Sequence, residues 1–235
     1  MDQTFEGKIA VVTGASFGIG RRTARMLAER GALVAVVARS TEPLQTLADE
    51  FHDRMLAIPG DVADPAIVET LFSRVEERFG DCDLLVNAAG MIDPGPMIDV
   101  TPESWDRMFA VNVRGCFLTA RRALPAMIAR RAGVVVNVAS ISGVAGPEKF
   151  PGFVSYCASK AAVIAMTEAL AVEVKPFGVR VNCVSPGSVD TRMWAAASGG
   201  SAADMTVDEV AEVILFLASD GSRPVNGQNI HVYSS

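Results

Sequence analysis

Short runs of apolar, mostly β-branched residues alternate with longer helical patterns along most of the chain. This alternation constrains the possible folds more than any other feature of the sequence. The runs are continuously apolar, which is typical of parallel strands that are covered on both faces. Strand–helix–strand repeats with right-handed crossovers build a doubly wound sheet. The seven predicted strands are residues 8–13, 33–38, 55–60, 83–87, 134–138, 179–184 and 228–232.

The sequence therefore predicts an α/β protein with a Rossmann-type fold, in which helices cover both faces of about seven parallel strands. We expect a single domain over residues 1–235, because no linker, repeat or low-complexity segment interrupts the pattern. Asp64 and the proline after it predict the start of one helix, and Gly80 predicts its end. The stretch 195–203 is rich in Ala, Ser and Gly and predicts a flexible loop.

The charge and the residue content exclude several classes of function. A net charge of −6 argues against a surface for nucleic acid or anionic membrane, since both need clustered Lys and Arg. Residues 1–8 lack an apolar signal-peptide core, and the longest uncharged run, 132–147, is too short to span a bilayer. The cysteines are widely spaced and neither His52 nor His231 lies among other ligand types, so we expect free thiols, no metal site and a cytoplasmic location.

Ligands of a doubly wound sheet bind at the carboxyl ends of the strands, where the strand order reverses. The first predicted strand is followed by Gly14, Ala15, Ser16, Phe17, Gly18, Ile19 and Gly20. Glycines let the backbone turn sharply and approach a pyrophosphate, which the free N–H groups of the next helix attract. The spacing differs from the standard G-x-G-x-x-G, and a turn without a ligand is the alternative. Its position after the first strand favours a nucleotide.

The end of the second predicted strand distinguishes between two dinucleotides. An acidic residue there binds the ribose hydroxyls of NAD, whereas an arginine accepts the 2′-phosphate of NADP. This chain has Ala38, Arg39 and Ser40, and its next acidic residue, Glu42, lies at the start of the following helix. A solvated surface arginine is the alternative interpretation, but the sequence favours NADP(H) over NAD(H).

Polar or small residues also follow the third, fourth and fifth predicted strands. An aspartate there is suited to the adenine amino group, and hydroxyls are suited to a substrate oxygen. Each group is also compatible with an ordinary cap or turn. The residues are Asp61 and Val62, then Asn87, Ala88, Ala89 and Gly90, and finally Ser140 and Ser142.

Tyr156 and Lys160 are four residues apart on a predicted helix that runs to about residue 175. This spacing places both side chains on one helix face. Free tyrosine titrates near pH 10, and a nearby cation favours the phenolate form. Such a pair provides a general acid–base near neutral pH, although a surface Tyr–Lys pair is the alternative for the isolated motif.

Taken together and in this order, the motifs resemble those of the classical short-chain dehydrogenase/reductase family. The resemblance rests on the glycine-rich turn, Asn-Ala-Ala-Gly at 87–90, Asn-Val-Ala-Ser at 137–140 and Tyr-x-x-x-Lys at 156–160. It includes Asn112 and the segment 186–191, and it covers residues 8–232. Several independent motifs in register are far more specific than any one of them.

The resemblance implies hydride transfer between NADP(H) and a carbonyl or secondary alcohol, with Tyr156 as the general acid–base. It implies that Ser140 holds the substrate oxygen, that Lys160 supports Tyr156 and binds the nicotinamide ribose, and that Asn112 supports a water relay to Lys160. The alternatives are an NAD-linked alcohol dehydrogenase and a catalytically silent dinucleotide-binding sensor or scaffold. The implied cofactor-binding residues are Gly14, Ser16, Phe17, Gly18, Ile19, Gly20, Arg39, Ser40, Asp61, Val62, Asn87, Ala88, Gly90, Tyr156, Lys160, Pro186, Gly187, Val189 and Thr191.

The chain departs from the family pattern in several places, among them the stretch between Thr191 and Thr206, which is shorter than the usual substrate lid. Phe17 stands where NADP-preferring members often have a basic residue. The interval between Ser140 and Tyr156 is longer than usual, which predicts an enlarged loop at 146–152 beside the pocket.

The resemblance and the apolar residues also predict the partners. An apolar substrate is suggested by the residues expected around the pocket, which are Met91, Met97, Phe150, Phe153 and Trp194. Relatives pair through two long helices, here about 104–129 and 153–175, and the second is unusually apolar. We therefore expect a homodimer or homotetramer with closed symmetry.

Overall fold

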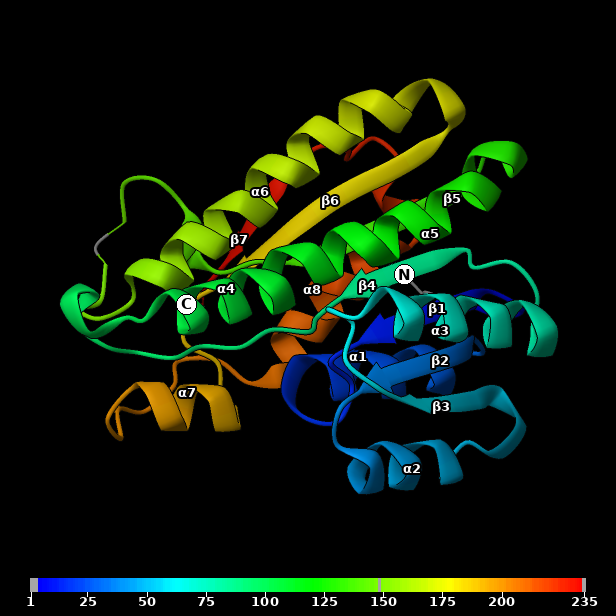
Figure 1. Cartoon of the computed structure of the whole chain (residues 1–235). Coiled ribbons are helices and arrows are strands. Elements are labelled where there is room, and N and C mark those ends of the chain that lie inside the picture. Colours follow the sequence, from blue (N-terminus) through cyan, green and yellow to red (C-terminus); the bar gives the residue numbers. More distant parts are fainter. Residues whose placement is uncertain (1–3, 148, 234–235) are drawn as a thin grey trace.

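The computed structural model describes residues 4–147 and 149–233, and its centre is one parallel sheet (Figure 1). The strand order is β3-β2-β1-β4-β5-β6-β7, so the order reverses between β1 and β4. The strands are β1 (Ile9–Thr13), β2 (Leu33–Ala38), β3 (Met55–Pro59), β4 (Leu84–Asn87), β5 (Gly133–Val138), β6 (Val179–Pro186) and β7 (Asn229–Val232). The predicted doubly wound sheet and its strands are confirmed. The ends of the predicted domain, 1–3 and 234–235, and residue 148 of the predicted loop lie outside the described residues.

The helices begin and end largely where the sequence indicated. They are α1 (Gly18–Glu29), α2 (Thr41–Asp49), α3 (Pro65–Arg78), α4 (Pro102–Phe109), α5 (Gly115–Arg130), α6 (Val154–Val174), α7 (Arg192–Ala197) and α8 (Val207–Ala218). Asp64 caps α3 by accepting a hydrogen bond from the backbone N–H of Ala66, and Gly80 follows the helix in the left-handed region with φ +108°. The loop predicted at 195–203 is wrong at its start, because α7 extends through Ala197. Alanine favours a helix, and the Thr191 side chain caps this one.

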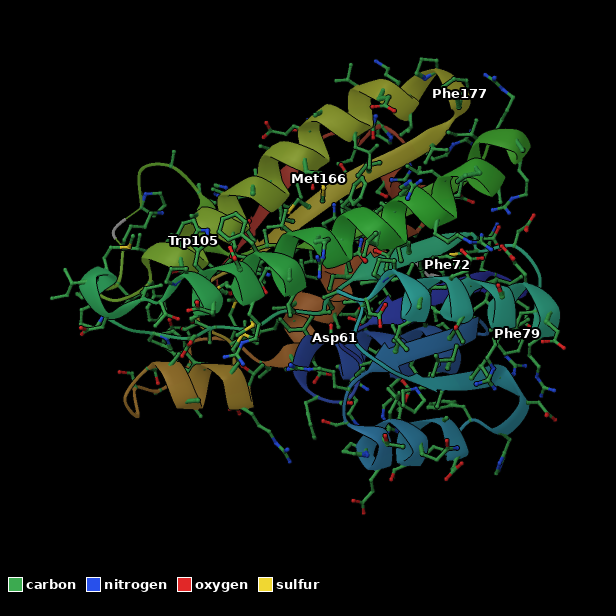
Figure 2. All side chains as sticks on the ribbon, viewed as in Figure 1. Asp61, Phe72, Phe79, Trp105, Met166 and Phe177 are labelled. Atoms are coloured by element: carbon green, nitrogen blue, oxygen red, sulfur yellow. The ribbon has the colours of Figure 1, made fainter. Side chains whose placement is uncertain are left out.

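Two hydrophobic cores cover the two faces of the sheet. Successive strand residues point to opposite faces, so Ala10 and Val12 pack with α1, α2 and α8, whereas Val11 packs with α3, α5 and α6. Phe72 on α3 is fully buried in the second core, and Figure 2 labels it on that face. This burial on both faces is why the strand runs are continuously apolar.

The predicted helix 104–129 is a continuous helical segment with one irregularity. A wide π-type turn, Ala110–Arg114, joins α4 to α5 and contains Asn112. Such turns are rare inside helices and are often found at functional sites. In the part of the chain that the structure describes, none of the helices is long and apolar enough to cross a membrane.

Candidate active site

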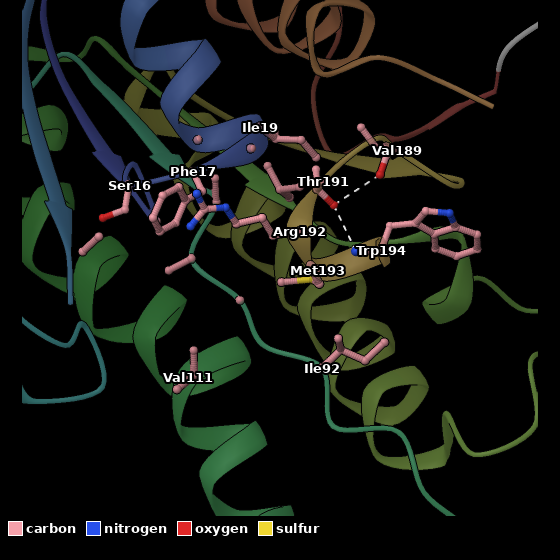
Figure 3. A pocket seen from close by; sticks show the side chains of 18 of the residues that line it. Ser16, Phe17, Ile19, Ile92, Val111, Val189, Thr191, Arg192, Met193 and Trp194 are labelled. Atoms are coloured by element: carbon pink, nitrogen blue, oxygen red, sulfur yellow. Dashed lines mark hydrogen bonds between the residues drawn. The ribbon is translucent and has the colours of Figure 1, made fainter. Parts of the chain in front are cut away.

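A pocket of about 330 Å³ lies at the carboxyl ends of the strands, where the strand order reverses (Figure 3). The glycine-rich loop after β1 forms one wall, together with the ends of β2, β3 and β4. The first turns of α6 and the segment that leads from β6 into α7 form the other wall. This is the position that the strand pattern predicts for a ligand site.

Close backbone contacts explain the glycine spacing after β1. Gly14 has φ +69°, and a Cβ there would lie 2.7 Å from the carbonyl oxygen of Ala88. A Cβ at Gly20 would lie 2.6 Å from the carbonyl oxygen of Gly14. Thr13 Oγ1 accepts hydrogen bonds from the backbone N–H groups of Ala88 (3.1 Å) and Ala89 (3.0 Å). These contacts hold the ends of β1 and β4 together under the pocket.

The loop is also tied to the end of β2. Ser16 Oγ donates a hydrogen bond to the carbonyl oxygen of Ser40 over 3.0 Å. Arg39, which precedes Ser40, is exposed and lines the pocket. A positive charge therefore lies at the rim of the pocket, at the residue that the sequence associated with a 2′-phosphate.

Tyr156 and Lys160 lie on one face of α6, and both line the pocket. Lys160 is 4% exposed, and its Nζ donates a hydrogen bond of 2.8 Å to the carbonyl oxygen of Val138 at the end of β5. The same Nζ lies 5.7 Å from the centroid of the Tyr156 ring. The predicted Tyr–Lys pair is thus a buried pair inside the pocket and not a surface pair.

Asn112 is fully buried beside this pair and fixes a loop. Its Oδ1 accepts from the backbone N–H of Met91 (2.8 Å), and its Nδ2 donates to the Met91 carbonyl (3.0 Å) and to Ser159 Oγ (2.9 Å). Asn112 itself is not part of the pocket lining. A Cβ at Gly90 would lie 3.5 Å from both Asn112 Oδ1 and Lys160 Nζ, so the two side chains flank the same point.

Ser140 is buried at the end of β5, where its Oγ accepts a hydrogen bond of 3.1 Å from the backbone N–H of Ser142. The pocket is lined by Ser142, whereas Ser140 is not part of the lining. The role that the sequence assigned to the Ser140 hydroxyl, holding the substrate oxygen, stays a prediction.

Asn87 takes part in a buried polar chain and does not line the pocket. Its Nδ2 donates to Asn137 Oδ1 (2.9 Å), and its Oδ1 accepts from Thr119 Oγ1 (2.7 Å). Asn137 Nδ2 continues the chain to Thr167 Oγ1 on α6 (2.9 Å). The chain links β4 and β5 to α5 and α6, so the side chain of Asn87 positions the wall from behind.

The structure brings together nearly all of the predicted site residues. The lining contains every predicted cofactor-binding residue except Asn87, and the catalytic candidates Asn112 and Ser140 are not part of it. The predicted residues in the lining are Gly14, Ser16, Phe17, Gly18, Ile19, Gly20, Arg39, Ser40, Asp61, Val62, Ala88, Gly90, Tyr156, Lys160, Pro186, Gly187, Val189 and Thr191.

Sequence reasoning missed the residues that close the pocket from the α7 side. Arg192 and Met193 both line it, and no signal in the sequence shows that they face the glycine-rich loop. Of the apolar residues expected there, Phe153 and Trp194 line the pocket, and Met91 and Met97 do not. The remaining one, Phe150, packs edge-on against Trp194 with ring centroids 5.9 Å apart.

The glycines leave a cradle that suits a dinucleotide. Gly18 begins α1 with φ +58°, and a Cβ there would lie 3.1 Å from Thr191 Cγ2 on the opposite wall of the pocket. Side chains at Gly18 and Gly90 would occupy the space between the two walls. A pocket with a helix N-terminus at one end and a lysine at the other fits a diphosphate joined to a ribose.

The cysteines do not belong to this site. Burial raises the pKa of the Cys82 and Cys183 thiols to about 12 and that of Cys116 to about 11, so these thiols are protonated at neutral pH. All four cysteines are free, as the sequence predicts. Among residues 4–147 and 149–233, no group of three or more His, Cys, Asp or Glu side chains could hold a metal ion.

Comparison with known proteins gives consistent matches over almost the entire chain. The profile of the family described as short chain dehydrogenase matches residues 8–201. An uncharacterized oxidoreductase of Staphylococcus aureus (strain MW2) is 36% identical over 226 residues, which cover 96% of each chain. The 3-oxoacyl-[acyl-carrier-protein] reductase of Escherichia coli (strain K12) is 34% identical, over 97% of this chain and 96% of the relative.

A solved structure is similar over the same length. It is the 3-ketoacyl-(acyl-carrier-protein) reductase from Brucella melitensis in complex with NADH. The two chains are 32% identical, superpose with a TM-score of 0.89, and cover 97% of each other.

The contacts of Asn112 generate a prediction for stability. Asn112→Ala leaves both backbone groups of Met91 without their partner, and an unsatisfied buried polar group costs about 1–3 kcal/mol. We expect the free energy of unfolding to fall by about 2–3 kcal/mol in urea denaturation. Gln45→Ala, at an exposed position on α2, should change it by less than about 0.5 kcal/mol. Equal effects of the two substitutions would show that Asn112 does not fix the loop.

Proposed function

Because the chain belongs to the short-chain dehydrogenase/reductase family of oxidoreductases, we propose that it transfers a hydride between NADP(H) and an apolar carbonyl or secondary alcohol. One observation carries the proposal. Tyr156 and Lys160 form a buried pair in the pocket whose far end is the glycine-rich start of α1. Acid–base chemistry and a dinucleotide cradle therefore occupy one cavity.

In the direction of reduction, the Tyr156 hydroxyl donates a proton to the carbonyl oxygen of the substrate. The bound cofactor supplies the hydride for the carbonyl carbon. Lys160, held by the Val138 carbonyl, places a positive charge beside the phenol and stabilises the phenolate that forms. The hydroxyl of Ser140, which accepts a hydrogen bond from the backbone N–H of Ser142 at the end of β5, is proposed to hold the substrate oxygen.

The residues between the two walls favour an apolar substrate. Ile92, Val111, Phe153, Met193 and Trp194 line the pocket together with Tyr156, and Phe153 packs against Tyr156 itself in a small cluster that Ile92 also contacts. Met193 and Trp194 belong to the short helix that closes the pocket, and methionine adapts to substrates of different shape. We therefore propose carbonyl compounds with apolar substituents as the substrate class.

Two other functions compete with this one, an NAD-linked alcohol dehydrogenase and a dinucleotide-binding sensor without turnover. The buried Tyr156–Lys160 pair favours an enzyme over a sensor, since a sensor has no need of it. The rates at which NADPH and NADH are oxidised in the presence of a panel of ketones distinguish the three proposed functions. Binding of a dinucleotide without turnover of any ketone or alcohol would favour the sensor.

Tyr156→Phe should reduce turnover by about 10²–10⁴-fold, because general acid–base catalysis contributes that much. The affinity for the cofactor should stay within a few-fold, since the ring remains. Tyr233→Phe removes the same hydroxyl from an exposed tyrosine outside the pocket and should leave turnover unchanged. A Tyr156→Phe variant that keeps half the wild-type rate would contradict the assignment.

The preference for NADP(H) is proposed from Arg39 at the rim. The guanidinium can bind the 2′-phosphate with parallel hydrogen bonds, and NAD lacks this phosphate. No acidic side chain lies between residues 34 and 40 to bind the ribose hydroxyls of NAD. A charge-assisted hydrogen bond contributes about 1.5–3 kcal/mol, which corresponds to a roughly ten- to hundredfold preference. Since Phe17 supplies no second charge, the lower part of this range is expected.

Wild type should therefore have a roughly tenfold higher kcat/KM with NADPH than with NADH. The double substitution Ala38→Asp with Arg39→Leu should reverse the preference, because the carboxylate repels the phosphate and binds the ribose hydroxyls. The measurement is kcat/KM for both cofactors in both proteins. A preference that the double substitution leaves unchanged would mean that Arg39 is only a solvated surface residue.

We also propose that the protein assembles through the outer face of α6. Val154 (49% exposed), Val172 (75% exposed) and several exposed alanines lie on this helix, and Phe117 is exposed on α5. Contiguous apolar surface on two helices is typical of a subunit interface. The expected assembly is a homodimer or homotetramer.

Light scattering at micromolar concentration should therefore give two or four times the chain mass of 24.8 kDa. Ala165→Asp, in the middle of this face, should shift the mass towards the monomer, because it introduces a charge into an apolar contact. Glu173→Asp on the same helix conserves the charge and should leave the mass unchanged. A monomeric wild type would contradict the proposed assembly.

A further inference from the structure

The side chain of Arg192 reaches across the pocket and stacks on Phe17. The guanidinium carbon lies 3.9 Å from the centroid of the Phe17 ring. Arg192 is the first residue of α7, and Phe17 directly precedes α1, so the contact joins the two walls (Figure 3). A guanidinium over an aromatic face is attracted by the ring, and its N–H donors remain directed outwards along its edge.

This contact lies beside the N-terminus of α1. Thr191, which precedes Arg192, approaches Gly18 so closely that a Cβ there would lie 3.1 Å from Thr191 Cγ2. The first turn of α1 contains no acidic residue, and no side chain caps it. The helix itself therefore places no anion or side-chain cap at the positive end of its dipole, which faces the pocket and favours an anionic ligand.

Among the residues that the structure describes, Arg192 has no ion-pair partner. It is exposed and lines the pocket. The helix terminus and the guanidinium thus converge on one region of the pocket with two sources of positive potential. The residue at position 17 carries no charge, but Arg192 brings one to the same place from the opposite wall.

We propose that Arg192 binds the diphosphate of the dinucleotide from the α7 side and that Phe17 positions its guanidinium. The inference rests on the proposed function, since it requires a nicotinamide dinucleotide in this pocket. The diphosphate is common to NAD and NADP, so Arg192 stabilises both cofactors by the same factor. Arg39, at the end of β2, acts on the 2′-phosphate alone. Arg192 thereby raises the affinity for both cofactors, and Arg39 determines the preference between them.

The test is the Kd of NADH and of NADPH, measured by the fluorescence of the reduced nicotinamide without any substrate. Arg192→Gln should weaken the binding of both cofactors about tenfold and by similar factors, because it removes charge-assisted hydrogen bonds. Arg74→Gln makes the same change of charge at an exposed position on α3 outside the pocket and should leave both Kd values unchanged. The melting temperature of the free protein should fall by no more than about 2–4 °C in Arg192→Gln, which loses the exposed contact with Phe17, and should stay unchanged in Arg74→Gln.

Two further measurements separate binding of an anion from a structural role. As the salt concentration rises, the affinity for NADH should fall more steeply in wild type than in Arg192→Gln. Salt screens the contact between Arg192 and the diphosphate, and the variant lacks this contact. Phe17→Leu should weaken both cofactors two- to fivefold, as expected for loss of a contact with an aromatic face. Phe17→Tyr, which keeps the ring, should restore the wild-type values.

The outcomes distinguish the inference from the function on which it rests. Wild-type binding together with unchanged Kd values for Arg192→Gln would overturn the role of Arg192 and leave the proposed function standing. If Arg192→Gln lost affinity for NADPH alone, the diphosphate assignment would be overturned, because Arg192 would then contact the 2′-phosphate. A wild-type protein that binds neither dinucleotide would overturn the proposed function itself.

Discussion

The pocket depends on the parallel pairing of β1 with β4, the point at which the strand order reverses. The chain leaves these two strands toward opposite faces of the sheet, so their carboxyl ends open a crevice between them. Thr13 closes the base of this crevice by holding the backbone of Ala88 and Ala89. Only glycine at position 14 allows the two segments this close, since any Cβ would collide with Ala88. The glycine-rich loop is therefore a packing requirement and a phosphate cradle at once.

A second constraint fixes the helix that carries Tyr156. The hydrogen-bonded chain from Thr119 through Asn87 and Asn137 to Thr167 runs through the interior and joins α6 to two central strands. Buried polar groups that are fully paired specify one arrangement, because any shift leaves an unpaired group in an apolar interior. The side chains of α6 thereby keep a fixed position relative to the strand ends. The position of the acid–base pair therefore depends on residues outside the pocket lining.

The sequence predicted the sheet and most of the residues that line the pocket, because both follow from local patterns. Continuous apolar runs reflect burial on both faces, and the glycines, Arg39 and the Tyr–Lys spacing all lie at strand or helix ends. Residues whose roles depend on distant contacts were less predictable. The side chain of Asn87 is paired with Asn137 and Thr119 in the interior, and Arg192 meets Phe17 across the pocket. A contact between residues so far apart in sequence leaves no trace in local spacing or periodicity.

The central claim is that one dinucleotide extends across the strand reversal, from the start of α1 to the Tyr156–Lys160 pair. A crystal structure of the protein with NADPH tests it most directly. The account predicts the diphosphate between Gly18 and Arg192, with the nicotinamide ring beside Tyr156. A dinucleotide bound outside this pocket, or with its nicotinamide directed away from Tyr156, would contradict it.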